Sequence, residues 1–331
     1  MINLAARALL VLISLTLTNA QTVTARQPDR ATLPGRPIKV ASLCLGMVRA
    51  DQTPEQREAR ERLVLEYLEE AGRKGADIAC TTEDFISKKA EPVPGPITRL
   101  MAQQAAKHRM YVLCNVRELH EGEPFNSAVL IDREGNIAGR YRKVYPWFGE
   151  GSVPGREGVP VFETDFGKIA ALTCFDSNFP ELWNEADMKG AEVVFWLSGG
   201  GGGVWVNAYA TLHNYYVFAV GNGQVADKTG EKFTPVDRPR PGLFLATVDL
   251  DRTFAHGNFN SAKIKRMLAE HKKEVELERH YKTENWYLLR AIQPGVRVRD
   301  LFRQYDIEVL RDYRNRSRRL IEQARRQRKP M

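Results

Sequence analysis

One thiol in this chain is placed for nucleophilic chemistry. The apolar run from Phe166 to Leu172 has the length and flanks of a buried strand, so Cys174 lies at the carboxyl end of that strand. Pro180 then opens a helical stretch that runs to about Met188. Functional sites in open α/β sheets gather at such strand-to-helix crossings. The competing interpretation is a buried structural cysteine, which is the commoner fate of a lone Cys.

Three charged residues follow other expected strands. Glu83 comes after a second apolar strand, Lys143 follows a predicted hairpin, and Glu150 closes the nearby Trp147 to Glu150 segment. Taken singly, each is more often a solvated surface charge. Together with Cys174, however, they form a pattern that is more informative than any of them alone.

The elements that position these residues alternate between strand and helix. Thr53, Pro54 and Gln56 form a capping box in front of the first helix. The alternation, interrupted by hairpins, predicts a mixed, layered α/β fold. Strands are expected at Ile38–Leu45, Ala76–Thr81, Met110–Val116, Ser127–Ile131, Ile137–Tyr141, Phe166–Thr173, Glu192–Leu197, Tyr216–Val220 and Gly242–Leu250, and helices at Pro54–Ala71, Pro96–His108, Pro180–Met188 and Val204–Asn214.

The chain strongly resembles the nitrilase superfamily of carbon–nitrogen hydrolases, in its amidase-like branch. The resemblance runs from about Ile38 to Asp251. It rests on the Glu after the second strand, on FNSAVLIDREGNIAGRYRKV before the Lys, and on TCFDSNFPEL around the Cys. It implies an α/β fold in the form of a four-layer αββα sandwich.

The resemblance also implies roles for the charged residues. Glu83 would be the general base, Lys143 the cation near the developing oxyanion, and Cys174 the nucleophile. Glu150 matches an additional acid that positions the substrate or the nucleophile. The chemistry is reasonable in itself, because a nearby cation favours the thiolate, and Lys143 with the backbone N–H of Phe175 can hold an oxyanion.

Glu83 would accept the thiol proton, pass it to the leaving ammonia or amine, and then activate water. No metal or organic cofactor is required. The histidines His213 and His256 are not needed for this triad and are expected to be structural or to line the pocket.

The residues after the Cys indicate the reaction. Cys-Phe-Asp followed by Phe-Pro-Glu resembles the amidase branches, which favours a small linear amide as substrate, with N-carbamoyl compounds, nitriles and acyl transfer as alternatives. The candidate apolar walls of the pocket are Trp147, Phe148, Phe175, Trp196 and Trp205. An alternative of another class is a non-catalytic envelope-associated binding protein that uses a basic tail.

Four segments are expected along the 331 residues. Residues 1–20 read as a signal peptide, with basic Arg7, an apolar run and small residues at the cleavage positions. Residues 21–36 form a flexible leader, 37–258 the hydrolase domain and 259–331 a helical, basic extension, helical from Ser261 to His280 and again at the end. An exported, periplasmic or secreted protein follows, with Cys44, Cys80, Cys114 and Cys174 expected as free thiols, unless neighbouring strands allow a bond between Cys44 and Cys80.

Most of the net charge of +8 lies in a tail. Residues 311–329 hold nine Lys or Arg and two acids, so 9 − 2 leaves +7 there. Such a tail fits contact with an anionic envelope surface, a homodimer or higher homo-oligomer, or a merely solvated helix, and no nucleic acid partner is expected.

Two loops are expected to lie near the site or to shape its surroundings. The run Gly199 to Gly203 lacks the Lys-Ser/Thr of a phosphate loop and is expected to be a flexible loop near the site. The segment after Asn222 is shorter than the family pattern, which would alter one pocket wall or a sheet edge.

Overall fold

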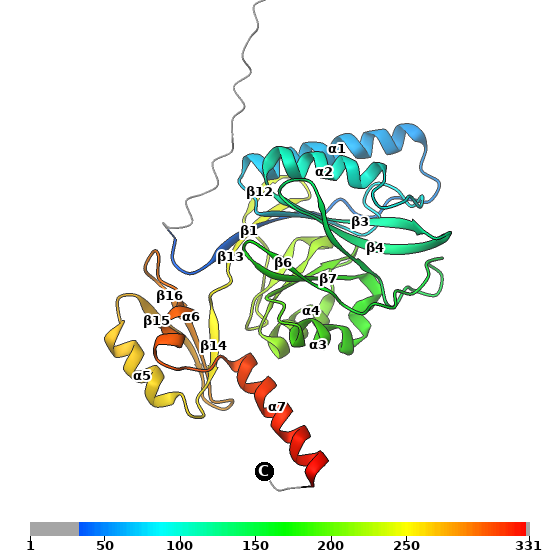
Figure 1. The fold of residues 1–331 in the computed structure, drawn as a ribbon. Helices are drawn as coiled ribbons and strands as arrows, with labels where there is room; N and C mark the ends of the chain where they lie inside the picture. Colours follow the sequence, from blue (N-terminus) through cyan, green and yellow to red (C-terminus); the bar gives the residue numbers. More distant parts are fainter. Residues whose placement is uncertain (1–32, 329–331) are drawn as a thin grey trace, which may run out of the picture.

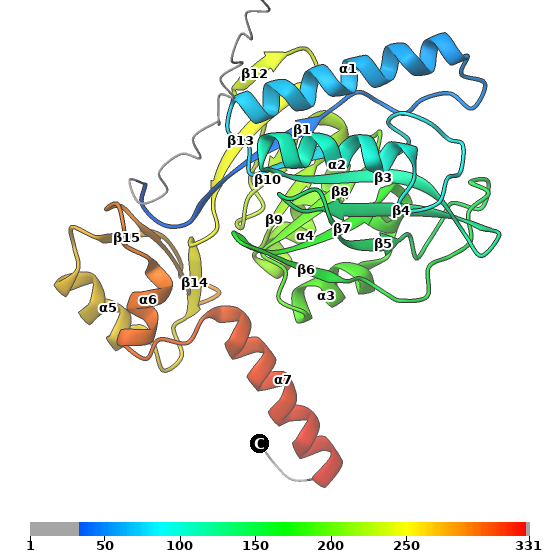
Figure 2. The same ribbon diagram turned by 45° about the horizontal axis from the view of Figure 1, so that its top comes forward.

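The computed structural model describes residues 33–328, and the predicted signal peptide and most of the leader lie outside the described residues. Two sheets stack face to face, with helices on the outer face of each (Figure 1). This is the predicted αββα sandwich, and the fold-class prediction is confirmed. A smaller unit with its own sheet lies to one side, and the last helix projects from it (Figure 2).

The first sheet has seven strands in the order β12-β13-β1-β2-β3-β4-β5. β1, β2 and β3 are parallel neighbours, so the residues that follow them emerge at one edge of the sheet. The helices α1 and α2 bury their apolar sides on its outer face. The elements are β1 Pro37–Leu43, α1 Pro54–Arg73, β2 Ile78–Thr81, α2 Pro96–His108, β3 Tyr111–His120, β4 Glu123–Ile131, β5 Ile137–Arg142, β12 Asp237–Arg240 and β13 Leu243–Asp249.

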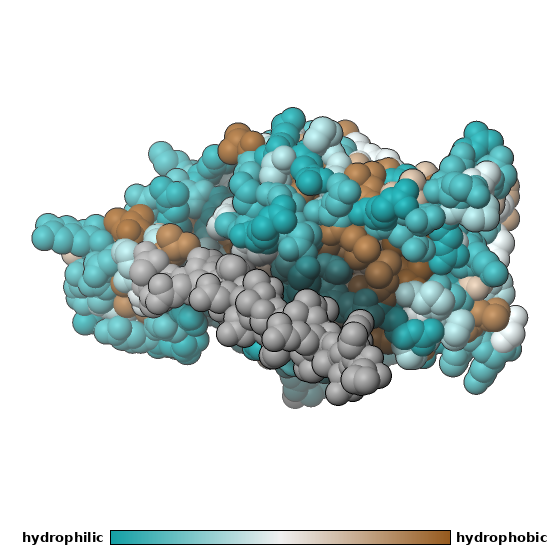
Figure 3. Space-filling model, turned by 90° about the horizontal axis from the view of Figure 1, so that it is seen from above, coloured by the Kyte–Doolittle hydropathy of each residue, from teal (hydrophilic) through white to brown (hydrophobic). Residues whose placement is uncertain are grey.

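The N-terminal end of α1 forms as its sequence predicts. Thr53 accepts a hydrogen bond from the Gln56 backbone N–H, and the Gln56 side chain accepts one from Thr53 in return. The face seen from above, on the side of α1 and α2, is mainly hydrophilic (Figure 3). The polar sides of these helices therefore face solvent while their apolar sides hold the sheet in place.

The second sheet has six strands in the order β11-β10-β9-β8-β7-β6. β7, β8 and β9 are parallel, and the main core lies between this sheet, the first sheet, α3 and α4. The elements are β6 Val161–Thr164, β7 Gly167–Thr173, a short 3-10 helix Cys174–Asn178, α3 Pro180–Met188, β8 Val193–Leu197, α4 Gly203–His213, β9 Tyr216–Ala219, a 3-10 turn Val220–Asn222, β10 Gln224–Ala226 and β11 Lys232–Phe233.

The segment after Asn222 supplies edge strands to both sheets. β10 and β11 extend the second sheet and β12 pairs with β13 in the first. The short connection therefore still completes the sandwich.

The C-terminal unit differs from its prediction. The expected helix from Ser261 to His280 is correct up to Glu270 and wrong beyond it, because residues 275–281 form a strand that pairs with β16. Val275 and Leu277 alternate with glutamates, which is the period of a strand. Because this segment pairs with the buried β16, it forms a strand and not a continuation of the helix. The elements are β14 Thr253–His256, α5 Ser261–Glu270, β15 Val275–Tyr281, β16 Trp286–Ala291, α6 Val298–Gln304 and α7 Leu310–Gln327.

Two boundaries also shift. β14 precedes the expected boundary at residue 258, yet it pairs with β16 of the C-terminal sheet. The leader was expected to be flexible to residue 36, but Pro34 bridges to Pro294 and Arg36 contacts Asp249 and Glu192. The end of the leader is thus held between the core and the C-terminal unit.

The last helix is attached at one end only. Leu310 is buried with Phe254 and Leu288, whereas Leu320 and Ile321 are exposed further along α7. Among the described residues, no helix combines the length and apolar character needed to cross a membrane.

Candidate active site

Cys174 stands directly after β7, in the conformation that ends the strand. Its φ of 45° is in the left-handed region, which is uncommon for a residue with a side chain. Three contacts hold this turn: Trp196 donates its indole N–H to the Cys174 carbonyl over 2.9 Å, and the Asp176 carboxylate accepts the backbone N–H groups of Thr173 and Tyr145. The strained position is therefore fixed by its surroundings, as at many reactive residues.

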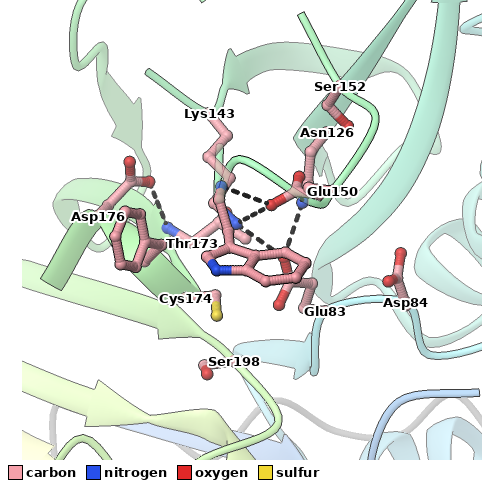
Figure 4. Close-up of polar contacts among 12 residues, drawn as sticks. Glu83, Asp84, Asn126, Lys143, Glu150, Ser152, Thr173, Cys174, Asp176 and Ser198 are labelled. Carbon is pink, nitrogen blue, oxygen red and sulfur yellow. Dashed lines mark hydrogen bonds and ion pairs between the residues drawn. The ribbon is translucent and has the colours of Figure 1, made fainter. Parts of the chain in front are cut away.

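The other predicted residues converge on this turn from the first sheet (Figure 4). Lys143 follows β5 and is buried, with its Nζ 3.0 Å from Glu83 Oε1 and 2.6 Å from Glu150 Oε2. Glu83, two residues after β2, and Ser198, directly after β8, lie beside the Cys174 thiol and influence its pKa (Figure 4). The structure thus brings together four residues that lie up to 91 positions apart, since 174 − 83 is 91.

The charges in this group are held by their pairing. Burial alone would lower the pKa of Lys143, but Glu83 and Glu150 raise it above its usual value, so the ammonium stays charged. Burial would raise the pKa of Glu150, but Lys143, Asn126 and Arg117 hold it below its usual value. Both groups are therefore ionised before substrate arrives.

The Cys174 thiol is protonated at rest, although a cation lies nearby. Burial, and then the negative charge of Glu83, raise the pKa of Cys174 to about 11, and the opposing effect of Lys143 is smaller. Lys143 does lower the pKa of the thiol, as expected, but burial and the negative charge of Glu83 outweigh it. A base must remove the thiol proton during the reaction.

Several polar residues missed by sequence reasoning complete the site. Asn126 Nδ2 donates to both Glu83 Oε1 and Glu150 Oε1 over 2.7 Å, and its Oδ1 accepts from Asn115. Asn126 lies within the FNSAVLID stretch, so the motif carried a signal for it.

Arg117 links the remaining groups. Its guanidinium donates twice to Asp84, at 2.7 and 2.8 Å, and its Nη1 donates to Glu150 and Ser152. The available signals were weak: Asp84 merely adjoins Glu83, and Arg117 is a charged residue in a strand that is otherwise mostly apolar. Asp176 and Ser198 were likewise visible only as polar residues after strands.

A cavity of about 490 Å³ opens above these groups. Cys174, Glu83 and Glu150 line it, and Trp147, Met47 and Pro124 supply apolar surface. Of the expected wall residues, Trp147 lines this cavity, but Phe148 is 93% exposed and Trp196 is buried with its indole against the Cys174 carbonyl. Those two expectations are wrong, because β8 is buried along its whole length with Trp196 packed in the core, and the loop leaves Phe148 in solvent.

Other expected residues lie elsewhere. Phe175 packs edge-on against Phe179, and Trp205 is outside the cavity lining. His213 contacts Asp187 and His256 stacks on Tyr313, so neither histidine lines this cavity. All four cysteines are free, and Cys44 donates to the Val220 carbonyl although its strand neighbours that of Cys80.

The loop after Ser198 reaches the site, as expected for the glycine run. Gly200 N–H donates to the Ser198 hydroxyl, and Gly202 has a φ of 73°, which favours glycine. The loop leads from Ser198, beside the thiol, into α4.

Comparison with known proteins shows which family this chain belongs to. The sequence model of the carbon-nitrogen hydrolase family matches residues 44–222, which include Glu83, Lys143 and Cys174. The chain belongs to the carbon-nitrogen hydrolase family. Formamidases of Bacillus cereus and Bacillus anthracis are 39% and 38% identical to this chain over 123 residues. The match spans 36% of this chain and 36% of the length of those curated relatives.

Solved structures support the fold of this hydrolase. An amidase from Nesterenkonia sp. superposes with a TM-score of 0.54 at 18% identity, over 66% of this chain and 92% of its own. Nit3 of Saccharomyces cerevisiae, described as a member of the nitrilase superfamily, superposes with a TM-score of 0.54 at 18% identity, over 69% of this chain and 95% of its own. These similarities establish the shared sandwich.

Proposed function

We propose that this carbon-nitrogen hydrolase cleaves a small linear amide through a thioester on Cys174, with release of ammonia or an amine. The observation that carries this proposal is that Glu83 and Cys174 line one cavity, with the buried Lys143 Nζ 3.0 Å from Glu83 Oε1. A nucleophile, a base and a fixed cation are the groups needed for attack on an unreactive carbonyl.

The first step begins from the neutral thiol. Glu83 takes the thiol proton as sulfur attacks the amide carbon, so a C–S bond forms and the carbonyl oxygen becomes an oxyanion. Lys143 and the backbone N–H of Phe175 stabilise that oxyanion. Phe175 is the second residue of the 3-10 helix, where backbone N–H groups lack intrahelical partners.

The second step releases the leaving group. The oxyanion collapses, the C–N bond breaks, and Glu83 gives its proton to the departing nitrogen. The resulting thioester is attacked by a water whose proton passes to Glu83, and collapse of that intermediate frees the acid and returns the proton to sulfur. Glu150 and Asn126 keep Lys143 and Glu83 in place throughout.

The cavity favours an uncharged substrate. Its cations are already paired, Arg117 with Asp84 and Glu150, and Lys88 with Asp84 at 3.6 Å. Apolar surface from Met47 and Trp147 suits an aliphatic acyl chain, and about 490 Å³ exceeds what the smallest amides need. N-carbamoyl compounds and nitriles would enter by the same route and rank behind amides.

A substrate screen tests this proposal. The purified protein is incubated with aliphatic amides from formamide upward, N-carbamoyl amino acids and nitriles, while ammonia release is followed. Intact-mass spectrometry of the quenched protein detects the acyl adduct on Cys174. Ammonia from amides with a matching adduct is expected, whereas no turnover of any class would favour the non-catalytic binding protein.

We also propose that the protein is a homodimer. On α4, Val204, Trp205 and Leu212 are 73%, 47% and 61% exposed on a helix that is apolar on most sides, and such a face is usually covered. Sedimentation equilibrium should give a dimer, and Leu212→Glu should give a monomer. An unchanged monomer in both proteins would contradict this proposal.

Export and contact with an anionic envelope surface are proposed from the sequence of residues 1–20 and the basic α7. Fractionation of the producing cell tests export, and salt-sensitive retention on anionic vesicles tests the contact. Retention that survives deletion of residues after 312 would contradict a role for α7.

A further inference from the structure

A second group of charged residues lies where the C-terminal unit meets the sandwich. Two cavities, of about 530 and 340 Å³, open there. Both are lined by Glu192, Arg299, Arg311 and Asp312. This junction lies away from the Cys174 cavity, with which it shares no lining residue.

Three basic residues from separate segments, Arg36, Lys228 and Arg299, act on the Glu192 carboxylate at this junction. Arg36 donates to Glu192 Oε1, and Arg299 Nη2 lies 3.0 Å from the same oxygen. Lys228 and Arg311 line the second cavity beside them. Although burial alone would raise the pKa of Glu192, Arg299, Arg36 and Lys228 hold it below its usual value.

The guanidinium groups here are only partly paired. Both Arg36 and Arg299 have a buried Nε–H without a hydrogen-bond partner in the described part of the chain. Arg299 has a single side-chain ion pair among these residues, and that pair shares one carboxylate oxygen with Arg36. Buried donors left unpaired are costly, so native proteins usually supply them with an acceptor.

The remaining acids do not supply that acceptor. Asp187 is already paired with Arg311 and His213. Asp249 and Asp251 accept backbone N–H groups instead, Asp249 from Arg36 and Asp251 from Val298. Of the acids that line the cavities, Asp165 pairs with Arg133, Glu163 with Lys168 and Glu308 with Arg316. Asp312 lines both cavities, yet in the described part of the chain the Nε–H groups of Arg36 and Arg299 stay without an acceptor.

The buried Lys228 shows how crowded with positive charge this junction is. Its ammonium is buried and donates to the carbonyls of Leu250 and Arg252 over 2.8 and 2.6 Å. Burial, and then the positive charge of Arg299, lower the pKa of Lys228 to about 7, against the opposing effect of Glu192 and Asp249. An anion bound nearby would relieve this repulsion.

We propose that the junction binds a small phosphate-bearing anion, held by Arg36, Arg299 and Arg311, which clamps the C-terminal unit to the sandwich. Guanidinium groups present forked N–H donors that match phosphate oxygens. Glu192 is a carboxylate that already binds Arg36 and Arg299, and it leaves their Nε donors unpaired. A doubly charged phosphate therefore fits the remaining donors better than a second carboxylate would. The cavity volumes accommodate a phosphate monoester.

The test compares phosphate with chloride at equal ionic strength and neutral pH. Inorganic phosphate should raise the thermal unfolding midpoint of the full-length protein in a saturable manner, and chloride should not. Arg299→Met should weaken the apparent phosphate affinity by about 10 to 100-fold, because it removes charge-assisted hydrogen bonds. A matched control, Arg325→Met on the far end of α7, should leave that affinity unchanged.

A change of opposite sign guards against simple damage to the fold. Glu192→Gln removes the carboxylate that competes for Arg36 and Arg299, so it should tighten phosphate binding by about tenfold. A second arm with phosphatidylglycerol vesicles tests whether the phosphate belongs to a lipid headgroup or is free in solution. Arg299-dependent binding in that arm alone would assign a lipid headgroup, and in the first arm a free phosphate.

The proposal is overturned if neither arm shows binding that depends on Arg299. It is also overturned if Glu192→Gln folds and weakens phosphate binding. Equal effects of Arg299→Met and Arg325→Met would reduce the observation to general charge screening, which likewise overturns a specific site.

Discussion

The two buried charge clusters of this molecule differ in how fully their charged groups are paired. In the cluster around Cys174, Arg117 makes four side-chain hydrogen bonds, and Lys143 lies between two carboxylates. In the cluster around Glu192, two arginines share one oxygen and each keeps an unpaired Nε–H. Complete pairing holds reacting groups in place before substrate binds, whereas incomplete pairing leaves donors for a ligand.

The clusters also differ in their origin along the chain. The first lies at strand ends within residues 44–222, the part that matches the family. The second needs Arg36 before β1 and Arg299 and Arg311 from the C-terminal unit, all outside that match. The part that matches the family thus holds the candidate active site, and the added unit brings its own charged interface.

The strongest test of the first cluster is removal of its nucleophile. Cys174→Ala should lower amide turnover by more than about 10⁴-fold and abolish the acyl adduct, because no other group supplies the sulfur. Ammonia release and intact-mass spectrometry measure both effects. Cys44→Ala is the matched control, since Cys44 is also a free thiol but does not line the cavity. Full activity in the Cys174 variant would remove this thiol from the mechanism.

Glu83→Gln tests the role of Glu83 as a base separately from its role in holding the site together. Turnover should fall by about 10² to 10⁴-fold because the thiol proton has no acceptor. The charge of Glu83 raises the pKa of Cys174, so its loss should lower that pKa from about 11 and preserve or speed alkylation by iodoacetamide at neutral pH. Loss of alkylation together with turnover would instead indicate a collapsed site.

Asn126→Ala tests whether the complete pairing matters. Asn126 contacts Glu83 and Glu150 without lining the cavity, so kcat should fall by about 10 to 100-fold with little change in KM. Ser152→Ala, which removes only one acceptor from Arg117, should have a much smaller effect. Steady-state kinetics on the best amide decide this, and equal losses in the two variants would argue against a positioning role.

The smallest expected effect concerns the stability of the second cluster. Without added phosphate, Arg311→Met should cost about 1 to 3 kcal/mol of unfolding free energy, because Arg311 donates to Asp187 and the Ala191 carbonyl. Arg318→Met, on the exposed part of α7, should change it by less than about 0.5 kcal/mol. Urea unfolding compares them, and similar values would mean that the junction contributes little.

The sequence predicted the sandwich and the elements that carry the site. Apolar runs, the capping box of α1 and Pro180 marked strands and helices locally, and the residues after those strands were the ones that converge. The prediction failed where a helical and a strand pattern of apolar residues are both possible. At residues 275–281 a helix was expected, but pairing with β16 makes this segment a strand. It also failed for Trp196, whose orientation depends on the pairing of β8 in the buried sheet.

The sequence by itself determined which chemical groups are present, and its resemblance to the nitrilase superfamily indicated that Glu83, Lys143 and Cys174 act together. Only the tertiary structure decided how their charges balance, because a pKa depends on burial and on neighbours that are distant along the chain. That is why the thiol of Cys174 is neutral at rest despite Lys143, and why Asn126 and Arg117 proved to matter. The junction around Glu192 was invisible for the same reason, since residues 36, 228, 299 and 311 meet only after folding.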